Sequence, residues 1–446
     1  MASVAVAALR KYFGSVYFIV TLFLLACLVT AAGLEVAGML VFVFLIMLVL
    51  FFTDDLLVTT PAFLLLSAFE IKSYGSYDTY IRFWWLIFPA IITAVFHFVK
   101  YKRSFSWGAN LYGTIAAAAA VTLGGLGAIT AKEYFSTVSL FYVTGLGVAM
   151  VVVYIIVSSS LKSDDKEALS ERFSTIMTAL CAFCFFMVFH HYAVNFGEVL
   201  KTGKILDFQW RNNISSLIMM SMPFPFYLSR RKSPYILIGF LGYFAMLVSG
   251  SRGGLIFGTI EFMLCLLMTI SFDKKRRRLN VAVFAGLIII FIMLASDLLG
   301  FIGKTFKRLL EYEENKIRLG LLERAVEDFK SNPLFGRGLG YFGNRDIHKS
   351  AKFSLCWYHS SPFQIIGSFG IFGAVCYAFQ FFIRMRTVFK NFDFFTCSVF
   401  LSWLGIEMMS LVNPGVFCPF PYLLMVTFSF VVLEKYGAEK MRSLRF

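Results

Sequence analysis

Charged residues are scarce in this chain of 446 residues. Only 15% of its residues are Asp, Glu, Lys or Arg, whereas about a quarter of a soluble globular domain is charged. Hydrophobic residues make up 59%, which is too many for a disordered chain. An internal repeat, a Gly/Ser-rich linker and the short alternating apolar segments of a membrane β-barrel are also missing. These absences exclude an ordinary soluble enzyme, a disordered protein, a fibrous protein and a barrel.

The sequence instead contains continuous apolar runs, many of them near the roughly 20 residues that a helix needs to cross a bilayer. Charged interruptions separate fourteen segments, near 13–32, 37–52, 57–69, 83–99, 108–130, 136–158, 173–193, 213–228, 234–249, 254–271, 279–301, 362–383, 394–412 and 419–434. The segment 57–69 is short and is typical of a re-entrant or interfacial element. We therefore predict an all-α polytopic membrane protein with about 12–14 transmembrane helices.

The distribution of Lys and Arg predicts the orientation, because short cytoplasmic loops are enriched in both. With the N-terminus in the cytoplasm, the basic C-terminal tail and every strongly basic short loop fall on the cytoplasmic side. These loops are 100–103, 159–172, 230–232, 274–278 and 384–390. The basic residues form no single stripe, so we expect no nucleic-acid partner. The chain then divides into N-terminal membrane helices (1–300), one large extracytoplasmic loop (301–361), and C-terminal helices with the tail (362–446).

The large loop is unusually basic for an outer loop. It contains eleven cationic residues: Lys304, Lys307, Arg308, Lys316, Arg318, Arg324, Lys330, Arg337, Arg345, Lys349 and Lys352. Long loops escape the topology rule, so an indifferent basic surface explains part of this charge. The interpretation that we favour is an anionic ligand at the outer face, such as a lipid diphosphate, with Arg324 and Arg337 among the residues that bind it.

Residues 315–331 of this loop predict an amphipathic helix, capped by Asn315 and ended by Asn332-Pro333. At about 100° per residue, one face is apolar and contains Leu319, Leu321, Leu322, Ala325, Val326 and Phe329. The opposite face contains Glu323, Arg324, Glu327, Asp328 and Lys330. Arg318 falls in the middle of the apolar face. It either extends to water at the rim or points into the membrane domain to bind an anion, which suits its planar guanidinium.

Two short stretches follow this helix. Gly336-Arg337-Gly338-Leu339-Gly340 favours a tight turn over a phosphate-binding loop. In Trp357-Tyr358-His359-Ser360, His359 lies at the outer mouth of the next helix beside the basic loop. An imidazole there is suited to removing a proton from a sugar hydroxyl near neutral pH, with Tyr358 as a neighbouring substrate contact. No second ligand stands at a zinc-binding spacing, so we expect neither a metal nor a cofactor.

Two more candidate positions belong to short outer segments. Arg252 lies in a turn of small residues, Ser249 to Gly254, which leaves room for a ligand. The alternative is an interfacial arginine that reaches for water. The loop 194–212 ends in Trp210-Arg211-Asn212-Asn213. We expect Arg211 and Asn213 to add polar contacts to a substrate.

Taken together and in this order, these stretches resemble the O-antigen ligase/polymerase superfamily of bacterial envelope glycan transferases. The shared features are a Ser-Arg-Gly turn, an Arg-x-x-x-Leu helix start before a Pro-Leu-x-Gly-x-Gly-x-Gly run, and His-[Asn/Ser]-x9-Gly-x2-Gly. Here they are Ser251-Arg252-Gly253, Arg318 to Leu322 with Pro333 to Gly340, and His359-Ser360 with Gly370 and Gly373. The resemblance covers roughly 205–380. It departs from the family at Leu322, where many members have Trp.

The resemblance implies a GT-C-like, metal-independent, inverting glycosyltransferase in the bacterial cytoplasmic membrane, with its active site at the outer face. The donor would be a glycan linked to undecaprenyl diphosphate, and the acceptor a glycan or lipid A–core. Arg252 and Arg318 would hold the diphosphate, and His359 would deprotonate the acceptor hydroxyl. Two alternatives stay open. Within the family, the protein would be a repeat-unit polymerase with the same donor. Outside it, the protein would be a transporter or flippase of lipid-linked glycans, which predicts ionisable residues in mid-membrane and paired broken helices. A structural scaffold is a third interpretation, and it leaves the His and Arg grouping unexplained.

Overall fold

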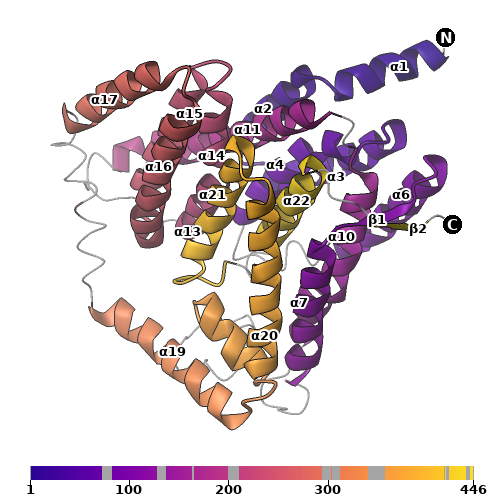
Figure 1. The fold of residues 1–446 in the computed structure, drawn as a ribbon, viewed down its shortest axis with the longest axis vertical. Coiled ribbons are helices and arrows are strands. Elements are labelled where there is room, and N and C mark those ends of the chain that lie inside the picture. The colour runs from indigo at the N-terminus through magenta and orange to yellow at the C-terminus, as the bar shows by residue number, and fades with distance from the viewer. Residues whose placement is uncertain are drawn as a thin grey trace. The chain divides into compact units, whose positions relative to one another are not determined.

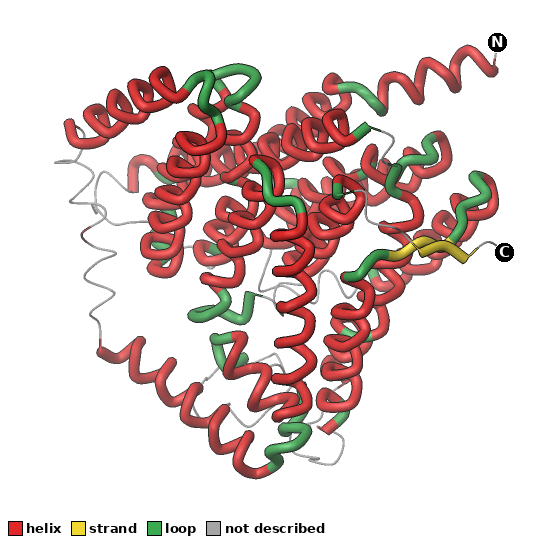
Figure 2. The backbone as a smooth tube through the Cα atoms, viewed as in Figure 1, coloured by secondary structure: helices red, strands yellow, loops and turns green. Residues whose placement is uncertain are grey.

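The computed structural model describes residues 2–72, 83–127, 137–162, 165–198, 210–293, 303, 312–339, 357–415, 417, 421–437 and 442–444. Within them the chain is almost entirely helical, with two short strands (Figure 2). The longer elements are α1 (Ala2–Phe13), α2 (Val16–Ala31), α3 (Glu35–Phe52), α4 (Thr60–Lys72), α6 (Ile87–Lys100), β1 (Phe105–Trp107), α7 (Asn110–Gly125), α9 (Thr137–Leu146), α10 (Val148–Ser160), α11 (Lys166–Val194), α13 (Arg211–Ser221), α14 (Pro223–Leu228), α15 (Tyr235–Val248), α16 (Arg252–Phe272), α17 (Arg277–Met293), α19 (Tyr312–Ser331), α20 (Ser361–Lys390), α21 (Phe394–Met409), α22 (Pro421–Tyr436) and β2 (Arg442–Leu444). Two 3₁₀ turns complete them, η1 (Leu56–Val58) and η2 (Trp84–Leu86).

Five helices in the described part of the chain are long and apolar enough to cross a membrane. They are Glu35–Phe52, Tyr142–Ser160, Lys166–Val194, Arg252–Phe272 and Ser361–Lys390. A sixth span results if Val6–Phe13 and Val16–Ala31, bent by 71°, count as one. This confirms the all-α polytopic membrane class. Within the described residues these spans are fewer than the 12–14 helices expected for the whole chain, because several apolar segments form shorter helices or break.

Proline explains one of these breaks. The segment 213–228 forms two helices, α13 and α14, which meet at Met222 and Pro223. Pro223 has no N–H, so it cannot continue the hydrogen-bond ladder of α13, but it fits the first turn of a new helix.

The chain folds as two compact units, each assembled from three separate stretches. Unit 1 contains Met1–Ser104, Ser160–Leu309 and Asp393–Gly405, and unit 2 contains Phe105–Ser159, Leu310–Phe392 and Ile406–Phe446. In unit 2, α19 and α20 pack together, and α20 also packs along α7 (Figure 1). The division into membrane helices, an extracytoplasmic loop and C-terminal helices concerns topology and stays a prediction.

Unit 1 is organised around α11, which packs against α2, α4, α13, α14 and α15. Its N-terminus is capped by Asp165, whose carboxylate accepts a hydrogen bond from the N–H of Glu167 (2.9 Å). Aromatic rings fill the space between the helices. Phe69 meets Phe183 edge-on at 5.8 Å between ring centroids, and Phe173 meets Phe224 at 5.4 Å. Such edge-to-face pairs add to the stabilisation that comes from burying the rings.

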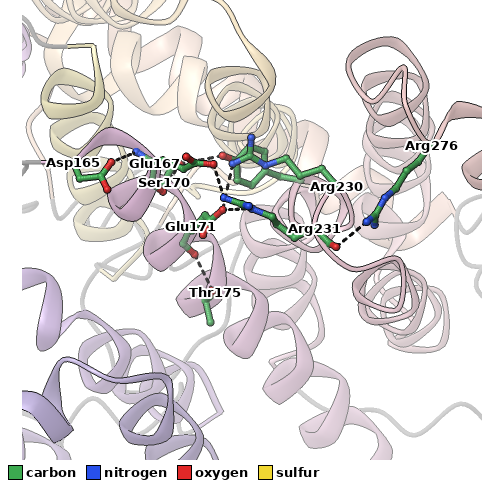
Figure 3. Close-up of polar contacts among 9 residues, drawn as sticks. Asp165, Glu167, Ser170, Glu171, Thr175, Arg230, Arg231 and Arg276 are labelled. Carbon is green, nitrogen blue, oxygen red and sulfur yellow. Dashed lines mark hydrogen bonds and ion pairs between the residues drawn. The ribbon is translucent and has the colours of Figure 1, made fainter.

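A cluster of charged side chains joins the first turns of α11 to the loops that end α14 and α16 (Figure 3). Arg231 pairs with both Glu167 and Glu171. Arg276 donates hydrogen bonds to the carbonyl oxygens of Ser229 and Arg231, both at 2.9 Å. The cluster therefore ties together three segments that are predicted to lie on the cytoplasmic side.

Unit 2 is built on the close packing of α20 along α7. A Cβ added at Gly124 would lie 2.9 Å from the Cα of Phe369, and one at Gly113 would lie 3.1 Å from the Cα of Gln380. Small residues at these points let the two helix backbones approach each other, as is common between membrane helices. Arg384 lies within α20 and not in the loop where the sequence placed it. It is 7% exposed, with its Nη1 3.8 Å from the Oε1 of Glu407.

A buried polar network joins the two ends of unit 2. Glu434 is fully buried and accepts hydrogen bonds from the Tyr154 hydroxyl (2.5 Å) and from both the backbone N–H (2.7 Å) and the Nδ2 (2.9 Å) of Asn110. Near it, β1 and β2 pair antiparallel, with Ser106 opposite Ser443. The buried donors of Tyr154 and Asn110 thus find their hydrogen-bond acceptor in a distant segment of the same unit.

Candidate active site

The amphipathic helix expected at 315–331 is present as α19 (Tyr312–Ser331). It begins three residues before Asn315, so this residue is not its cap, and it ends directly before Asn332-Pro333 as predicted. The buried face is rotated from the expected one. Leu321 and Ala325 are fully buried, whereas Leu319 is 56% exposed.

Two polar residues share this buried face, because positions i, i+3, i+7 and i+10 of a helix align. Arg318 lies at its start and is half-buried, and its Nη1 donates a hydrogen bond to the carbonyl oxygen of Val412 at 3.2 Å. Asp328 lies at its end and is 3% exposed. Asp328 therefore belongs to the packed face and not to the polar face where the sequence pattern placed it.

The Gly-rich stretch after α19 packs against a break in α20. Gly370 has φ 63° and ψ −155°, which interrupts the helix, and the interruption leaves backbone groups on both sides without helical partners. The stretch 333–338 provides partners for these groups through four backbone hydrogen bonds. They are Arg337 N to Gly367 O (2.9 Å), Gly338 N to Ser368 O (3.0 Å), Ile371 N to Pro333 O (2.8 Å) and Phe372 N to Leu334 O (3.1 Å). The stretch is more than a turn, since it completes the broken helix.

Glycine is required on both sides of this contact. Gly336 has φ 68°, and a Cβ there would lie 2.4 Å from the carbonyl carbon of Ser368. At Gly370, a Cβ would lie 2.5 Å from the carbonyl oxygen of Pro333. Side chains are disfavoured at positive φ, and these distances leave them no space. Two of the glycines in the motifs therefore have a backbone role that the structure shows directly.

His359 directly precedes α20 and has an unusual backbone conformation. Its φ is 54°, in the left-handed region, where only one other described non-glycine residue, Lys102, is found. Histidine is among the residue types enriched there, but the conformation still costs on the order of 1–3 kcal/mol and persists only when neighbours enforce it. The His359 side chain is half-buried.

Tyr358 is one of these neighbours, and it is fully buried. Its hydroxyl donates a hydrogen bond to the Oδ2 of Asp328 (2.5 Å), and its backbone N–H donates to the Oε1 of Gln364 (3.0 Å). The sequence pattern identified Tyr358 as a substrate contact, and that role stays a prediction. Asp328 and Gln364 were missed, because a buried acid or amide is recognised only when its partner in the fold is known.

The other candidate residues of unit 2 also have defined partners. The Nε of Arg324 lies 3.6 Å from Asp328 Oδ1, and its Nη1 lies 3.4 Å from Glu327 Oε2. Arg337 donates from its Nε to the Ser331 hydroxyl (2.6 Å). Their predicted contact with a substrate is untested by these interactions. Six cationic residues of the basic loop lie outside the described residues: Lys304, Lys307, Arg308, Arg345, Lys349 and Lys352.

In unit 1, Arg211 and Arg252 are the first residues of α13 and α16. The Ser251 side chain caps α16 by accepting from the Gly254 N–H (3.1 Å) and donates to the Oδ1 of Asn212 (2.9 Å). This bond brings the N-termini of the two helices together. Helix N-termini favour anions, and a cation at each strengthens that preference. Asn213, in the first turn of α13, is 6% exposed.

The structure thus places Arg211, Asn213 and Arg252 in unit 1, and Arg318, Arg324, Arg337, Tyr358 and His359 in unit 2. Among the described residues, no three His, Cys, Asp or Glu side chains gather as metal ligands would. What both groups offer is guanidinium groups and one imidazole, a set suited to holding an anion and moving a proton.

A protein-family model matches the middle of the chain. Residues 237–378, about a third of the sequence, match the family model described as O-antigen ligase. No curated protein matches the chain. The matched range includes α16 with Arg252, α19 with Arg318, the Gly-rich stretch and His359. The match supports glycosyl transfer of the O-antigen ligase or polymerase type. It confirms the resemblance of this membrane protein to the O-antigen ligase superfamily.

Proposed function

We propose that this protein transfers a glycan from undecaprenyl diphosphate to a sugar hydroxyl of lipid A–core, at the outer face of the bacterial cytoplasmic membrane. The observation that carries the proposal is the conformation of His359. A strained histidine stands in the unit that also holds Arg318, inside the segment that matches the O-antigen ligase family. Residues held in such conformations cluster at active sites and ligand clamps.

In the proposed reaction, the acceptor oxygen attacks the anomeric carbon as the bond between that carbon and the diphosphate oxygen breaks. His359 takes the proton of the attacking hydroxyl, which makes the oxygen a better nucleophile. The electron pair of the broken bond leaves with undecaprenyl diphosphate. Arg318 would stabilise the negative charge that develops there, and the same role for Arg252 stays an expectation from the sequence motif. Attack from the side opposite to the leaving group inverts the anomeric configuration.

The test is transfer by the purified protein in detergent, with undecaprenyl-diphosphate-linked repeat units and EDTA, in the presence and absence of lipid A–core. We expect product only with lipid A–core. His359→Ala and Arg318→Ala should each lower the rate at least 100-fold, in line with the effect of losing a general base or an oxyanion donor. His190→Ala, in α11, and Lys330→Ala, exposed on α19, are the matched controls and should keep the wild-type rate.

Other outcomes separate the alternatives. A ladder of longer glycans without lipid A–core would identify a repeat-unit polymerase with the same donor. Undiminished product from both site variants would remove His359 and Arg318 from the mechanism. Absence of product with every acceptor would contradict the transferase and leave transport of the lipid-linked glycan as the better explanation.

A further inference from the structure

The strain at His359 requires an explanation from its surroundings, and the residues on both sides of it are held firmly. After it, the Ser361 N–H donates to the carbonyl oxygen of Ser410 (2.7 Å), and the Ser360 carbonyl accepts from Gln364 as α20 begins (2.8 Å). Before it, the buried ring of Tyr358 packs on Gly367, where a Cβ would lie 2.9 Å from the Tyr358 Cε2. His359 therefore has little freedom to leave the left-handed conformation.

A residue of α19 fixes the position of the Tyr358 side chain. The 2.5 Å hydrogen bond from the Tyr358 hydroxyl to Asp328 links the residue before His359 to a helix that lies some thirty residues earlier in the chain. The carboxylate of Asp328 is buried, and Arg324 lies one turn before it on the same helix with its Nε 3.6 Å from Asp328 Oδ1. A hydrogen bond to a buried, charged acceptor is among the stronger ones. It fixes the distance between α19 and the start of α20.

Arg318 lies on the same face of this helix, ten residues before Asp328, or about 15 Å along the axis at 1.5 Å per residue. We propose that Asp328 and Tyr358 are positioning residues: their hydrogen bond sets the position and the strained conformation of His359 relative to Arg318. Neither needs to touch the substrate for this role, since the Tyr358 hydroxyl donates its hydrogen bond inside the protein. This inference rests on the proposed function for its catalytic consequence, but not for its structural one.

Tyr358→Phe isolates the hydrogen bond, because it removes only the hydroxyl. The chain offers a matched control in Tyr154→Phe, which removes a buried tyrosine hydroxyl that donates to a buried carboxylate, Glu434, at the same 2.5 Å in the same unit. Asp328→Ala removes the acceptor, and Asp328→Asn restores an oxygen that can accept the bond. The four variants separate loss of this bond from a general loss of stability.

The first measurement does not depend on activity. Diethyl pyrocarbonate acylates imidazole nitrogens, and mass spectrometry of the peptide that contains His359 gives its labelling rate. We expect Tyr358→Phe and Asp328→Ala to change that rate at least threefold, while Asp328→Asn and Tyr154→Phe stay within 1.5-fold of wild type. An equal rate in Tyr358→Phe and Tyr154→Phe would overturn the proposal, even if the protein catalyses no transfer.

The second measurement is kinetic. Tyr358→Phe should lower kcat at least tenfold and leave the KM for the lipid-linked donor within twofold, since binding through the arginines is unchanged. In a His359→Ala background the same substitution should have no further effect on the residual rate, because residues that act through one another are not additive. Additive losses, or a loss shared by Tyr154→Phe, would show that the bond contributes stability alone. If wild type fails to transfer with every acceptor, the proposed function fails and the labelling result still decides the positioning.

Discussion

At the scale of single residues, backbone conformation marks the candidate site more clearly than side-chain charge does. The left-handed His359 and the positive-φ glycines at 336 and 370 all lie where α19, the Gly-rich stretch and α20 meet. Contacts with other parts of unit 2 offset the energetic cost of each of these conformations. Substitutions there should therefore act through the backbone.

Gly370→Ala should destabilise the protein strongly, because the new Cβ combines left-handed strain with a 2.5 Å approach to Pro333 and Leu334. We expect a loss of at least about 3 kcal/mol, since the strain alone amounts to 1–3 kcal/mol. Thermal unfolding in detergent, followed by tryptophan fluorescence, measures the effect. Gly286→Ala in α17 is the control, since nothing lies within 4 Å of its Cβ. Equal melting temperatures for the two variants would contradict the role assigned to Gly370.

At the scale of elements, α19 shows how much a helical pattern predicts and where it stops. The pattern identified the helix and its end, because both depend on local sequence. It did not identify the exposed Leu319 or the buried Asp328, because these depend on Tyr358 and α20. The same limit applies to α20, where the sequence pattern drew attention to Gly370 without indicating that the helix breaks there.

Two leucines on α19 test the orientation of this face. Leu321→Ala should cost about 2–5 kcal/mol, the usual range for a fully buried leucine, because Leu321 is 0% exposed. Leu319→Ala should change the stability little, because Leu319 is 56% exposed. Chemical or thermal unfolding of the two variants gives the comparison. A larger loss of stability from Leu319→Ala than from Leu321→Ala would contradict this orientation and favour the buried face expected from the sequence periodicity.

The charged cluster of Figure 3 contains interactions of two kinds, and they should respond differently to salt. Arg231 is about half exposed where it pairs with Glu167 and Glu171, so Arg231→Gln should lower the melting temperature slightly, with no difference in 1 M salt. Arg276 donates to two backbone carbonyls, so Arg276→Gln should lower it more, and this difference should persist in salt. Melting curves at low and high ionic strength test both statements. Salt-independent behaviour of Arg231→Gln would contradict the first.

At the scale of the whole molecule, one membrane-spanning helix contains a buried ionisable residue, a feature that transport of a lipid-linked glycan predicts. Glu261 is the tenth residue of the 21-residue α16 and is fully buried. Among the described residues, neither of its carboxyl oxygens has a hydrogen-bond partner, and a Cβ at Gly405 would lie 2.4 Å from its Oε2. An unpaired carboxylate there would be very costly, so we expect the group to carry its proton.

Glu261→Gln separates the two classes of function. A transferase that uses His359 and Arg318 should keep at least half of its wild-type rate in this variant, because the neutral amide has the shape of the protonated acid. A carrier that moves its cargo by charging and discharging Glu261 should lose its activity while keeping its melting temperature. The transfer assay, together with an assay of lipid-linked glycan movement in liposomes, distinguishes them.

The sequence predicted the membrane class and the resemblance to the O-antigen ligase family, because hydropathy and short motifs are local properties. It could not predict the composition of the two units. Asn110 and Glu434 are 324 residues apart in the chain, and nothing in either segment indicates the other. The pairing of Ser106 with Ser443 is equally distant. Such contacts are a property of the assembled fold, and a pattern confined to one window cannot contain them.

The distant partners of Glu434 also constrain the order in which the protein is made. Asn110 and Tyr154 enter the membrane early in synthesis, and the carboxylate that satisfies them belongs to α22. Unit 2, with His359 and Arg318, therefore cannot close until the ribosome has released α22, and until then α7 and α10 expose polar groups that need a temporary partner. A chain that stops before α22 would therefore lack the buried acceptor to which Asn110 and Tyr154 donate.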